Sequence, residues 1–506
     1  MHYRYQDERI VAAWSDEAKL LEWEDVELAV VLAREILGRI PRGTHERIKV
    51  ILKANPPDIE WWHAREKETD HDLQAFLDER LRHLLPELQC YLHEDMTSYD
   101  TEEPAFVFRL YRSAEIVQKE AIELLTVLKG LALKYRFAPM QARTHGQEAE
   151  LKTFGARCAC WYRDLILDLV VLDQAESQMK YAKLSGAVGN YTGMDPELER
   201  KALSLFMEDL RPYVGATQIL PRELFVSLSG ALVQIVGTIN KIATVIRLMA
   251  RSGRPTAQEP FGKKQKGSSA MPHKKNTIKT EKIEGMSRMA QGYQQMIVQN
   301  ISTWEERAIE QSSVERVAWQ DLFHVTVHSI TTMRRVLQGL RVYPDNMLYE
   351  IAASRGTYAS VHAKELLKEL LSPHGYPQNV AYRIVQLAAF CVFSPDEESK
   401  KLRENLANDL TEADRLLVDY RDHLLNKTAI SSDSIQSIIP AGRLFWVEDL
   451  DIAHEDIEVW NTLLRAVFTD EEAMARWNEI FKPSFILKGE KALLQSIFPK
   501  TIDFRF

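Results

Sequence analysis

The chain has 506 residues, of which 45% are hydrophobic and 27% are charged, and its formal net charge is −9. This length and apolar content allow a large buried core and suggest about three domains. The acidic balance excludes a general nucleic-acid binder, which needs a basic field over much of its surface.

The first residues of the chain, 1–9, are charged rather than apolar, and no run reaches the roughly 20 apolar residues that cross a bilayer. We therefore expect a cytoplasmic protein that does not contact membranes. Residues 1–100 are expected to form an N-terminal helical domain, because prolines interrupt the chain at 56–57 and again at Pro104.

The cysteines show no CxxC spacing and are too few for a disulfide framework, so we expect reduced thiols. No HExxH or EF-hand pattern occurs either, and we expect no metal site. The four cysteines are Cys90, Cys158, Cys160 and Cys391.

Long amphipathic stretches dominate the middle of the chain, residues 101–345. The clearest runs from Leu224 to Met249, where apolar residues recur at alternating spacings of three and four. That period predicts a long helix in a bundle. The sequence therefore predicts an all-α protein with a central bundle of about five long helices, whose broad apolar faces favour association with other subunits. The other four stretches lie around 106–136, 151–182, 280–311 and 313–340.

Residues 261–279 interrupt this helical pattern. Gly262 and Gly267 flank three lysines, which predicts an exposed, mobile, cationic loop. A helix that begins near Thr280 would add a favourable potential for negative charge beside the loop. By composition alone, the segment also fits a solvated linker or a weak phosphate or nucleic-acid patch.

Within this loop, residues 267–276 read Gly-Ser-Ser-Ala-Met-Pro-His-Lys-Lys-Asn. Two serine hydroxyls, the Lys274 ammonium and the Asn276 amide can surround a carboxylate or a carbanion. After a further break at 343–345, residues 346–506 are expected to form a C-terminal helical domain. From about residue 430 it extends into an added helical cap or assembly surface with Trp446, Trp460 and Trp477.

The segment 267–276 resembles the signature loop of the fumarase/aspartase superfamily, and the version with His273 resembles its adenylosuccinate lyase branch. The resemblance implies a three-domain fold that assembles as a homotetramer around a shared twenty-helix core, with active sites drawn from several subunits. It also implies that Ser268 is the general base, while Ser269, Lys274 and Asn276 hold the substrate. Thr277 departs from the proline that the family usually has there.

His145 lies in the segment Arg-Thr-His-Gly-Gln, which also resembles the family. Histidine suits proton transfer near neutral pH, although an isolated loop histidine is usually just exposed. By resemblance, His145 is the general acid that protonates the departing nitrogen, and Thr144 contacts the substrate.

Further family segments carry substrate contacts by the same resemblance. Taken alone, their histidines and hydroxyls also fit a solvated helix face or an N-cap, and their arginines also fit salt bridges to neighbouring glutamates. Departures from the family pattern occur at Asp70, Asp95, Ala308 and Gln311. The expected substrate-binding residues are Arg4, Tyr5, His71, Asp72, His93, Thr97, Ser98, Gln218, Arg222, Arg307, Ser312, Ser313 and Arg316.

The resemblance implies β-elimination of fumarate from adenylosuccinate to give AMP, and from the succinylated aminoimidazole carboxamide ribotide, in purine synthesis. It implies a small nucleotide as the binding partner and no metal or organic cofactor. Two alternatives stay open: a sister lyase acting on argininosuccinate, aspartate, malate or carboxymuconate, and a non-catalytic helical scaffold. His273, His71 and the pair Arg4-Tyr5 favour the nucleotide.

Overall fold

The computed structural model describes residues 1–354, 356–375, 378–379, 381–382, 385–386, 389 and 471–499. The described chain is mostly helical, which confirms the predicted class. It forms two compact units, here called the bundle unit and the hairpin unit. The bundle unit is Met1–Val127, Arg163–Leu248 and Glu259–Leu340, and the hairpin unit is Leu128–Tyr162, Met249–Gln258 and the described part of Arg341–Phe506. The division into domains 1–100, 101–345 and 346–506 stays a prediction.

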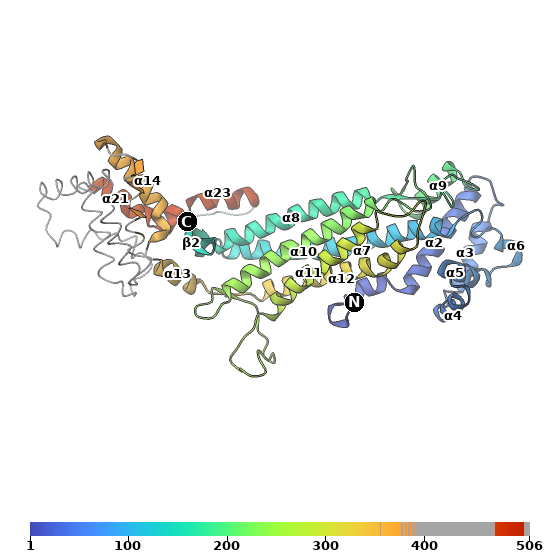
Figure 1. Cartoon of the computed structure of the whole chain (residues 1–506), viewed down its shortest axis with the longest axis horizontal. Coiled ribbons are helices and arrows are strands. Elements are labelled where there is room, and N and C mark those ends of the chain that lie inside the picture. The colour runs from blue at the N-terminus through green and yellow to red at the C-terminus, as the bar shows by residue number, and fades with distance from the viewer. Residues whose placement is uncertain are drawn as a thin grey trace, which may run out of the picture. The chain divides into compact units, whose positions relative to one another are not determined.

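Five long helices carry the fold, as the apolar periodicity predicted (Figure 1). On α10 the predicted stripe is buried, and Leu228, Ile235, Ile242 and Ile246 are each 0% exposed. By length and composition α10 also has the character of a membrane span, but a buried core helix of a soluble protein passes the same test. The five are α7 Ser98–Lys134, α8 Phe154–Gln178, α10 Glu223–Met249, α11 Ile278–Gln299 and α12 Glu310–Gln338.

Shorter helices at the N-terminal end of the bundle unit begin at side-chain caps. Ser15 Oγ accepts a hydrogen bond from the Ala18 backbone N–H at 3.1 Å, and Asp58 caps α4 in the same way. Two short strands, β3 Tyr181–Ala182 and β4 Arg211–Pro212, pair in parallel. The shorter helices are η1 Tyr3–Tyr5, α1 Glu8–Ala13, α2 Asp16–Ile36, α3 Thr44–Ala54, α4 Ile59–Thr69, α5 Asp72–Leu81, α6 Pro86–Gln89 and α9 Pro196–Phe206.

The hairpin unit contains an antiparallel pair, β1 Pro139–Thr144 and β2 Gln147–Thr153. Its two-residue loop is His145-Gly146, and both residues have positive φ, 53° and 80°. Two positive φ values in a two-residue loop are the mark of a type I′ turn, which glycine favours at its second position. The sequence analysis placed His145 on a loop but did not predict the hairpin.

Within the hairpin unit, a hydrophobic core joins the β1–β2 hairpin to the C-terminal helices. Trp477, at 0% exposed, packs in one cluster with Leu151, Ile351 and Leu367. Glu490 accepts hydrogen bonds from the Thr153 backbone N–H at 2.9 and 3.0 Å. The remaining elements are β5 Ala257–Gln258, β6 Arg341–Val342, α13 Pro344–Ala353, η2 Thr357–Ala359, α14 Ser360–Leu371, η3 Ser372–His374, α21 Glu471–Ile480, α22 Pro483–Ile486 and α23 Lys488–Ile497.

The predicted cap from about residue 430 falls largely outside the described residues, and so do Trp446, Trp460 and Cys391. Its described part, residues 471–499, contributes Trp477 to the core of the hairpin unit. The other three cysteines are free thiols.

Candidate active site

Four predicted substrate contacts meet where α5, α7 and α12 begin in the bundle unit. His71 caps α5, because its Nδ1 accepts a hydrogen bond from the Gln74 backbone N–H at 3.3 Å. In a neutral ring this leaves the proton on Nε2, which lies 3.4 Å from Ser98 Oγ. Asp72 Oδ2 accepts from Arg316 Nη2 at 3.0 Å. The structure therefore brings His71, Ser98, Asp72 and Arg316 together in two pairs.

Asp72 and Arg316 also line a cavity of about 280 Å³ within the bundle unit. The predicted residues Arg222 and Ser312 line it too. The Ser312 hydroxyl donates to the Ile309 carbonyl at 2.8 Å. Ser313 is exposed on α12.

Arg222 is 3% exposed and is held by two carboxylates. Its Nη1 donates to Glu103 Oε1 at 2.7 Å, and its Nε donates to Glu315 Oε1 at 2.9 Å. A third bond runs from its Nη2 to Glu315 Oε2 at 3.1 Å. The structure thus gives Arg222 internal partners, and its part in substrate binding stays a proposal.

The cavity wall also contains an acidic group that the sequence analysis did not single out. Burial, with the nearby Asp72 carboxylate, raises the pKa of Glu102 to about 8. Glu102 is consequently protonated over much of the neutral range, which reduces the negative charge that the cavity presents to an anion.

Arg307 and Gln218 form a direct pair in the same unit. Arg307 Nη1 donates to Gln218 Oε1 at 2.9 Å, and Gln218 Nε2 donates to the Ala187 carbonyl at 3.1 Å. Ala187 belongs to the Gly186–Gly189 turn, where a Cβ added at Gly189 would lie 1.9 Å from the Ala216 carbonyl oxygen. Glycine is required there because the two backbone segments approach so closely.

Thr97 lies at the start of α7 and is held by a carboxylate inside the helix. Its backbone N–H donates to Asp100 Oδ2 at 2.9 Å, as in a capping box. Asp100 is itself paired with Lys183 at 2.6 Å, and both side chains are 0% exposed. This buried pair fixes the position of the Thr97-Ser98 segment.

His93, which precedes α7, contacts the Glu27 carboxylate. His93 Nδ1 lies 2.7 Å from Glu27 Oε1, and the His93 backbone N–H donates to Glu27 Oε2 at 2.9 Å. Burial acts to lower the pKa of His93, but the Glu27 carboxylate more than offsets it, and the pKa is raised. His93 therefore carries a partner within the protein, and its contact with substrate stays a proposal.

The signature loop belongs to the bundle unit and is mostly exposed. Ser268 Oγ accepts hydrogen bonds from two backbone N–H groups, those of Ala270 at 3.3 Å and Met271 at 3.1 Å. Asn276 Nδ2 donates to the Gly267 carbonyl at 2.9 Å. Ser269 and Lys274 are exposed. The loop thus exposes Ser269 and Lys274, leaves Ser268 half-buried, and is closed at its base by Asn276.

The helix after the loop begins at Ile278, two residues before the predicted start at Thr280. Two of its first three N–H groups are not free for a ligand, because Glu259 accepts from Lys279 N at 3.3 Å and from Thr280 N at 3.2 Å. The carboxylate of Glu259 therefore lies at the helix terminus where a substrate anion was expected.

Thr144 and His145 are exposed at the tip of the β1–β2 hairpin, in the hairpin unit. Arg143 braces the tip through ion pairs with Glu350 at 3.2 Å and Glu148 at 3.5 Å. The general base and the general acid that the sequence predicts are therefore carried by different compact units of the chain.

Arg4 and Tyr5 lie in the short helix η1. Arg4 is exposed, and Tyr5 packs edge-on against His328 of α12 with ring centroids 5.3 Å apart. Burial lowers the pKa of His328 to about 4. The N-terminal segment is thus anchored on α12 by a neutral aromatic contact.

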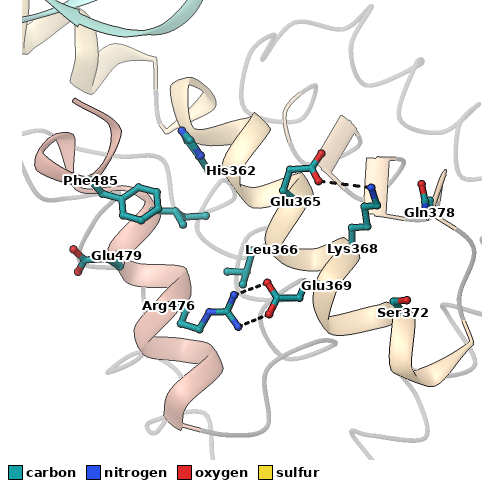
Figure 2. Close-up of a pocket in the computed structure, with 11 residues that line it drawn as sticks. His362, Glu365, Leu366, Lys368, Glu369, Ser372, Gln378, Arg476, Glu479 and Phe485 are labelled. Carbon is teal, nitrogen blue, oxygen red and sulfur yellow. Dashed lines mark hydrogen bonds and ion pairs between the residues drawn. The ribbon is translucent and has the colours of Figure 1, made fainter. Parts of the chain in front are cut away.

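A second cavity, of about 570 Å³, lies between α14 and α21 in the hairpin unit (Figure 2). Its Arg476 forms two bonds to Glu369, at 2.9 and 2.6 Å, and its Lys368 lies 3.8 Å from Glu365. None of the residues predicted for the active site lines it. Across the described ranges, no group of three His, Cys, Asp or Glu side chains is arranged to hold a metal ion.

Comparison with known proteins adds independent evidence. A protein-family model described as Lyase matches residues 25–292. An adenylosuccinate lyase of Thermotoga maritima is 35% identical over 409 residues, which are 79% of this chain and 93% of that protein. One of Aquifex aeolicus is 34% identical over 406 residues, which are 80% of this chain and 91% of the relative. The chain belongs to the adenylosuccinate lyase family. This confirms the resemblance on which the sequence analysis relied.

Solved structures agree with the adenylosuccinate lyase assignment at the level of the fold. A fumarate lyase from Mesorhizobium sp. BNC1 matches with a TM-score of 0.74 at 19% identity, covering 98% of this chain and 99% of that one. A β-carboxy-cis,cis-muconate cycloisomerase from Acinetobacter calcoaceticus sp. ADP1 matches with a TM-score of 0.72 at 17% identity, covering 98% of both chains.

In this adenylosuccinate lyase family member, sequence reasoning missed several residues beside the predicted contacts. Tyr99 and Asp100 directly follow Thr97 and Ser98, so proximity in the chain could have identified the whole segment 97–100. Glu102 follows it on the same helix turn. Lys183 carries no sequence signal, because only the folded chain brings it to Asp100.

Proposed function

We propose that the chain cleaves adenylosuccinate to AMP and fumarate by β-elimination, and cleaves the succinylated aminoimidazole carboxamide ribotide in the same way. The observation that carries this proposal is the 35% identity to an adenylosuccinate lyase across 93% of that protein. The cluster of His71, Ser98, Asp72 and Arg316 supports it, because polar and charged side chains converge beside a cavity.

Ser268 is the proposed general base. A serine hydroxyl is a poor base, so it needs an environment that favours the alkoxide. The Ala270 and Met271 N–H groups that point at Ser268 Oγ supply part of that environment, since hydrogen bonds to a charged form stabilise it. The proton removed lies beside a carboxylate, and the resulting carbanion delocalises its charge into that carboxylate.

Lys274, Asn276 and Ser269 are proposed to hold that carboxylate. Preorganised donors around developing charge supply much of the catalysis in such reactions, about 10²–10³-fold for a single donor. In the structure Asn276 is engaged with Gly267 at the base of the loop. This bond uses one of the two N–H donors of the amide, so its other N–H and its oxygen can still contact the substrate.

His145 is the proposed general acid for the leaving nitrogen. As the family resemblance implies, we propose that Ser268 and His145 meet in an active site shared between subunits of a homotetramer. Exposed apolar side chains along the long helices support such an assembly, because a surface of that kind favours association. Examples are Ile122 on α7, Leu167 and Val170 on α8, and Val317 on α12, which are 48–61% exposed.

The nucleotide and succinyl groups are proposed to contact the residues named from the sequence. Arginine forks and hydroxyls suit the phosphate and the carboxylates of this substrate. We propose a cytoplasmic location and no nucleic-acid or membrane partner. The substrate contacts are Arg4, Tyr5, His71, Asp72, His93, Thr97, Ser98, Thr144, Gln218, Arg222, Arg307, Ser312, Ser313 and Arg316.

One assay tests the function. Purified protein is incubated separately with adenylosuccinate, argininosuccinate, aspartate and malate, and fumarate is followed by its absorbance. Release from adenylosuccinate supports the proposal. Release from one of the other three alone identifies a sister lyase. Release from none contradicts the proposal and leaves a carboxymuconate-type enzyme or a non-catalytic scaffold.

A further inference from the structure

Arg307 differs from Arg222 and Arg316 in how many of its guanidinium N–H donors are already engaged within the protein. Arg222 uses its guanidinium on Glu103 and Glu315, and Arg316 is paired with Asp72. Within the described ranges, Arg307 donates one hydrogen bond, to Gln218, and forms no ion pair with a carboxylate. Since a guanidinium carries five N–H donors, most of those of Arg307 remain available for an anion.

The plane of the Arg307 guanidinium is set by an aromatic ring. Its central carbon lies 4.0 Å from the centroid of the Tyr99 ring, which is within cation–π distance. Tyr99 is 4% exposed, so the ring cannot turn freely. The Tyr99 hydroxyl accepts a hydrogen bond from Gln311 Nε2 at 3.3 Å, and Gln311 is 1% exposed.

These contacts form a continuous support from the buried Gln311 through Tyr99 to Arg307, with Gln218 holding one edge of the guanidinium. A flexible arginine loses side-chain entropy when it binds an oxyanion, and prior fixation of its plane reduces that cost.

We propose that Tyr99 is a positioning residue whose ring orients Arg307 to bind an oxyanion of the substrate. This inference rests on the proposed function. The oxyanion is either the phosphate or a succinyl carboxylate, and the two products distinguish them. AMP carries only the phosphate, whereas fumarate carries only the carboxylates.

The test compares Tyr99→Leu, which removes the ring, with Tyr99→Phe, which keeps it. Tyr99→Leu is expected to raise KM for adenylosuccinate roughly three- to tenfold. A change of this size corresponds to the loss of the cation–π contact between Arg307 and the Tyr99 ring. The effect on kcat is expected to stay within about twofold, because the lost orientation affects ground-state and transition-state binding alike. Tyr99→Phe is expected to retain the wild-type KM within about twofold, since its ring face is unchanged.

A matched control is Tyr111→Leu, on the same helix α7, where the cation over the ring is Lys180 at 5.7 Å. Its KM is expected to equal that of the wild type. Melting curves of all variants establish that each is folded. A rise in KM for Tyr111→Leu equal to that for Tyr99→Leu would overturn the proposal, because the effect would then be general to the helix.

Two further measurements separate orientation from loss of packing. Tyr99→Leu is expected to weaken AMP binding if Arg307 holds phosphate, or inhibition by fumarate if it holds a carboxylate; unchanged affinity for both products overturns the inference. In an Arg307→Met background, which removes the cation, Tyr99→Leu is expected to add no further rise in KM. If Tyr99→Leu raises KM as much in that background as in the wild type, the inference is overturned. A wild-type protein that binds AMP but releases no fumarate contradicts the proposed function alone.

Discussion

The side-chain amide of Asn276 donates a hydrogen bond to the backbone carbonyl of Gly267, with the two atoms 2.9 Å apart. This bond closes the base of the loop that carries Ser268 and Lys274. The two ends of this loop segment also approach each other closely, since a Cβ added at Gly267 would lie 1.7 Å from the Lys274 carbonyl oxygen. The loop can therefore adopt this shape only with glycine at 267.

Gly267→Ala is expected to lower fumarate release by more than about tenfold, because displacement of a catalytic group by an ångström can cost about 10²-fold. The matched control is Gly262→Ala in the same loop, where the nearest atom to an added Cβ is 3.7 Å away and the substitution is sterically tolerated. Steady-state rates and melting temperatures are measured for both. Equal activity of the two variants would show that the observed loop shape is not the catalytic one.

Ser268→Ala is expected to lower kcat by about 10²–10⁴-fold, the usual contribution of proton transfer by a positioned group. AMP affinity is expected to persist, because the hydroxyl is assigned to proton removal rather than to nucleotide binding. Wild-type turnover by this variant would reject Ser268 as the base.

His145→Ala is expected to show a similar loss of turnover. If the site is shared between subunits, mixing the two inactive variants under conditions that exchange subunits restores part of the activity, because some sites then combine an intact Ser268 with an intact His145. Exchange demonstrated by mass spectrometry without recovery of fumarate release would contradict a shared site.

The periodic helices were predictable because their signal is local. Along α10 the apolar residues themselves mark the buried face, and no distant contact is needed to identify it. The β1–β2 hairpin was not predictable in the same way. Its register shifts between Gln141 and Arg143, and the polar Gln141 is buried. The alternation of apolar and polar residues that indicates a strand is therefore lost.

The same difference between local and distant signals applies to the candidate active site. The motifs identified Ser268, His145 and the arginines by residue type and spacing, but not their partners in the folded chain. Arg222 is held by Glu103 and Glu315 through contacts across 93 or more positions of sequence. Such pairings depend on how helices pack, which a single sequence does not reveal.

Glu102→Gln is expected to change the pH dependence of stability. The pKa of Glu102 is raised from 4.5 to about 8 in the folded protein, chiefly by burial. The folded state therefore binds this proton more tightly than the unfolded chain, and the wild type loses stability as the pH rises from 4.5 to about 8. Glutamine does not titrate. The melting temperature of the variant relative to the wild type should thus increase between pH 5 and pH 9, and a decrease over that range would contradict the assignment.

Lys183→Met is expected to destabilise the protein by about 3–5 kcal/mol, because it leaves the Asp100 carboxylate buried without its countercharge. Lys183 and Asp100 are both 0% exposed and lie 2.6 Å apart. The matched control is Lys241→Met, which breaks a pair with Asp164 of the same length but with side chains 53% and 36% exposed. That change is expected to cost less than about 1 kcal/mol.

Urea unfolding of both lysine variants measures the difference, and the double variant Asp100→Asn, Lys183→Met tests its cause. Removing the orphaned charge is expected to recover part of the lost stability, since the penalty comes from the unpaired carboxylate rather than from lost packing. Because Asp100 also accepts from the Thr97 backbone N–H, Lys183→Met should raise KM for adenylosuccinate through displacement of the adjacent Ser98. Equal stability losses for Lys183→Met and Lys241→Met would mean that the buried pair does not hold this end of α7 in place.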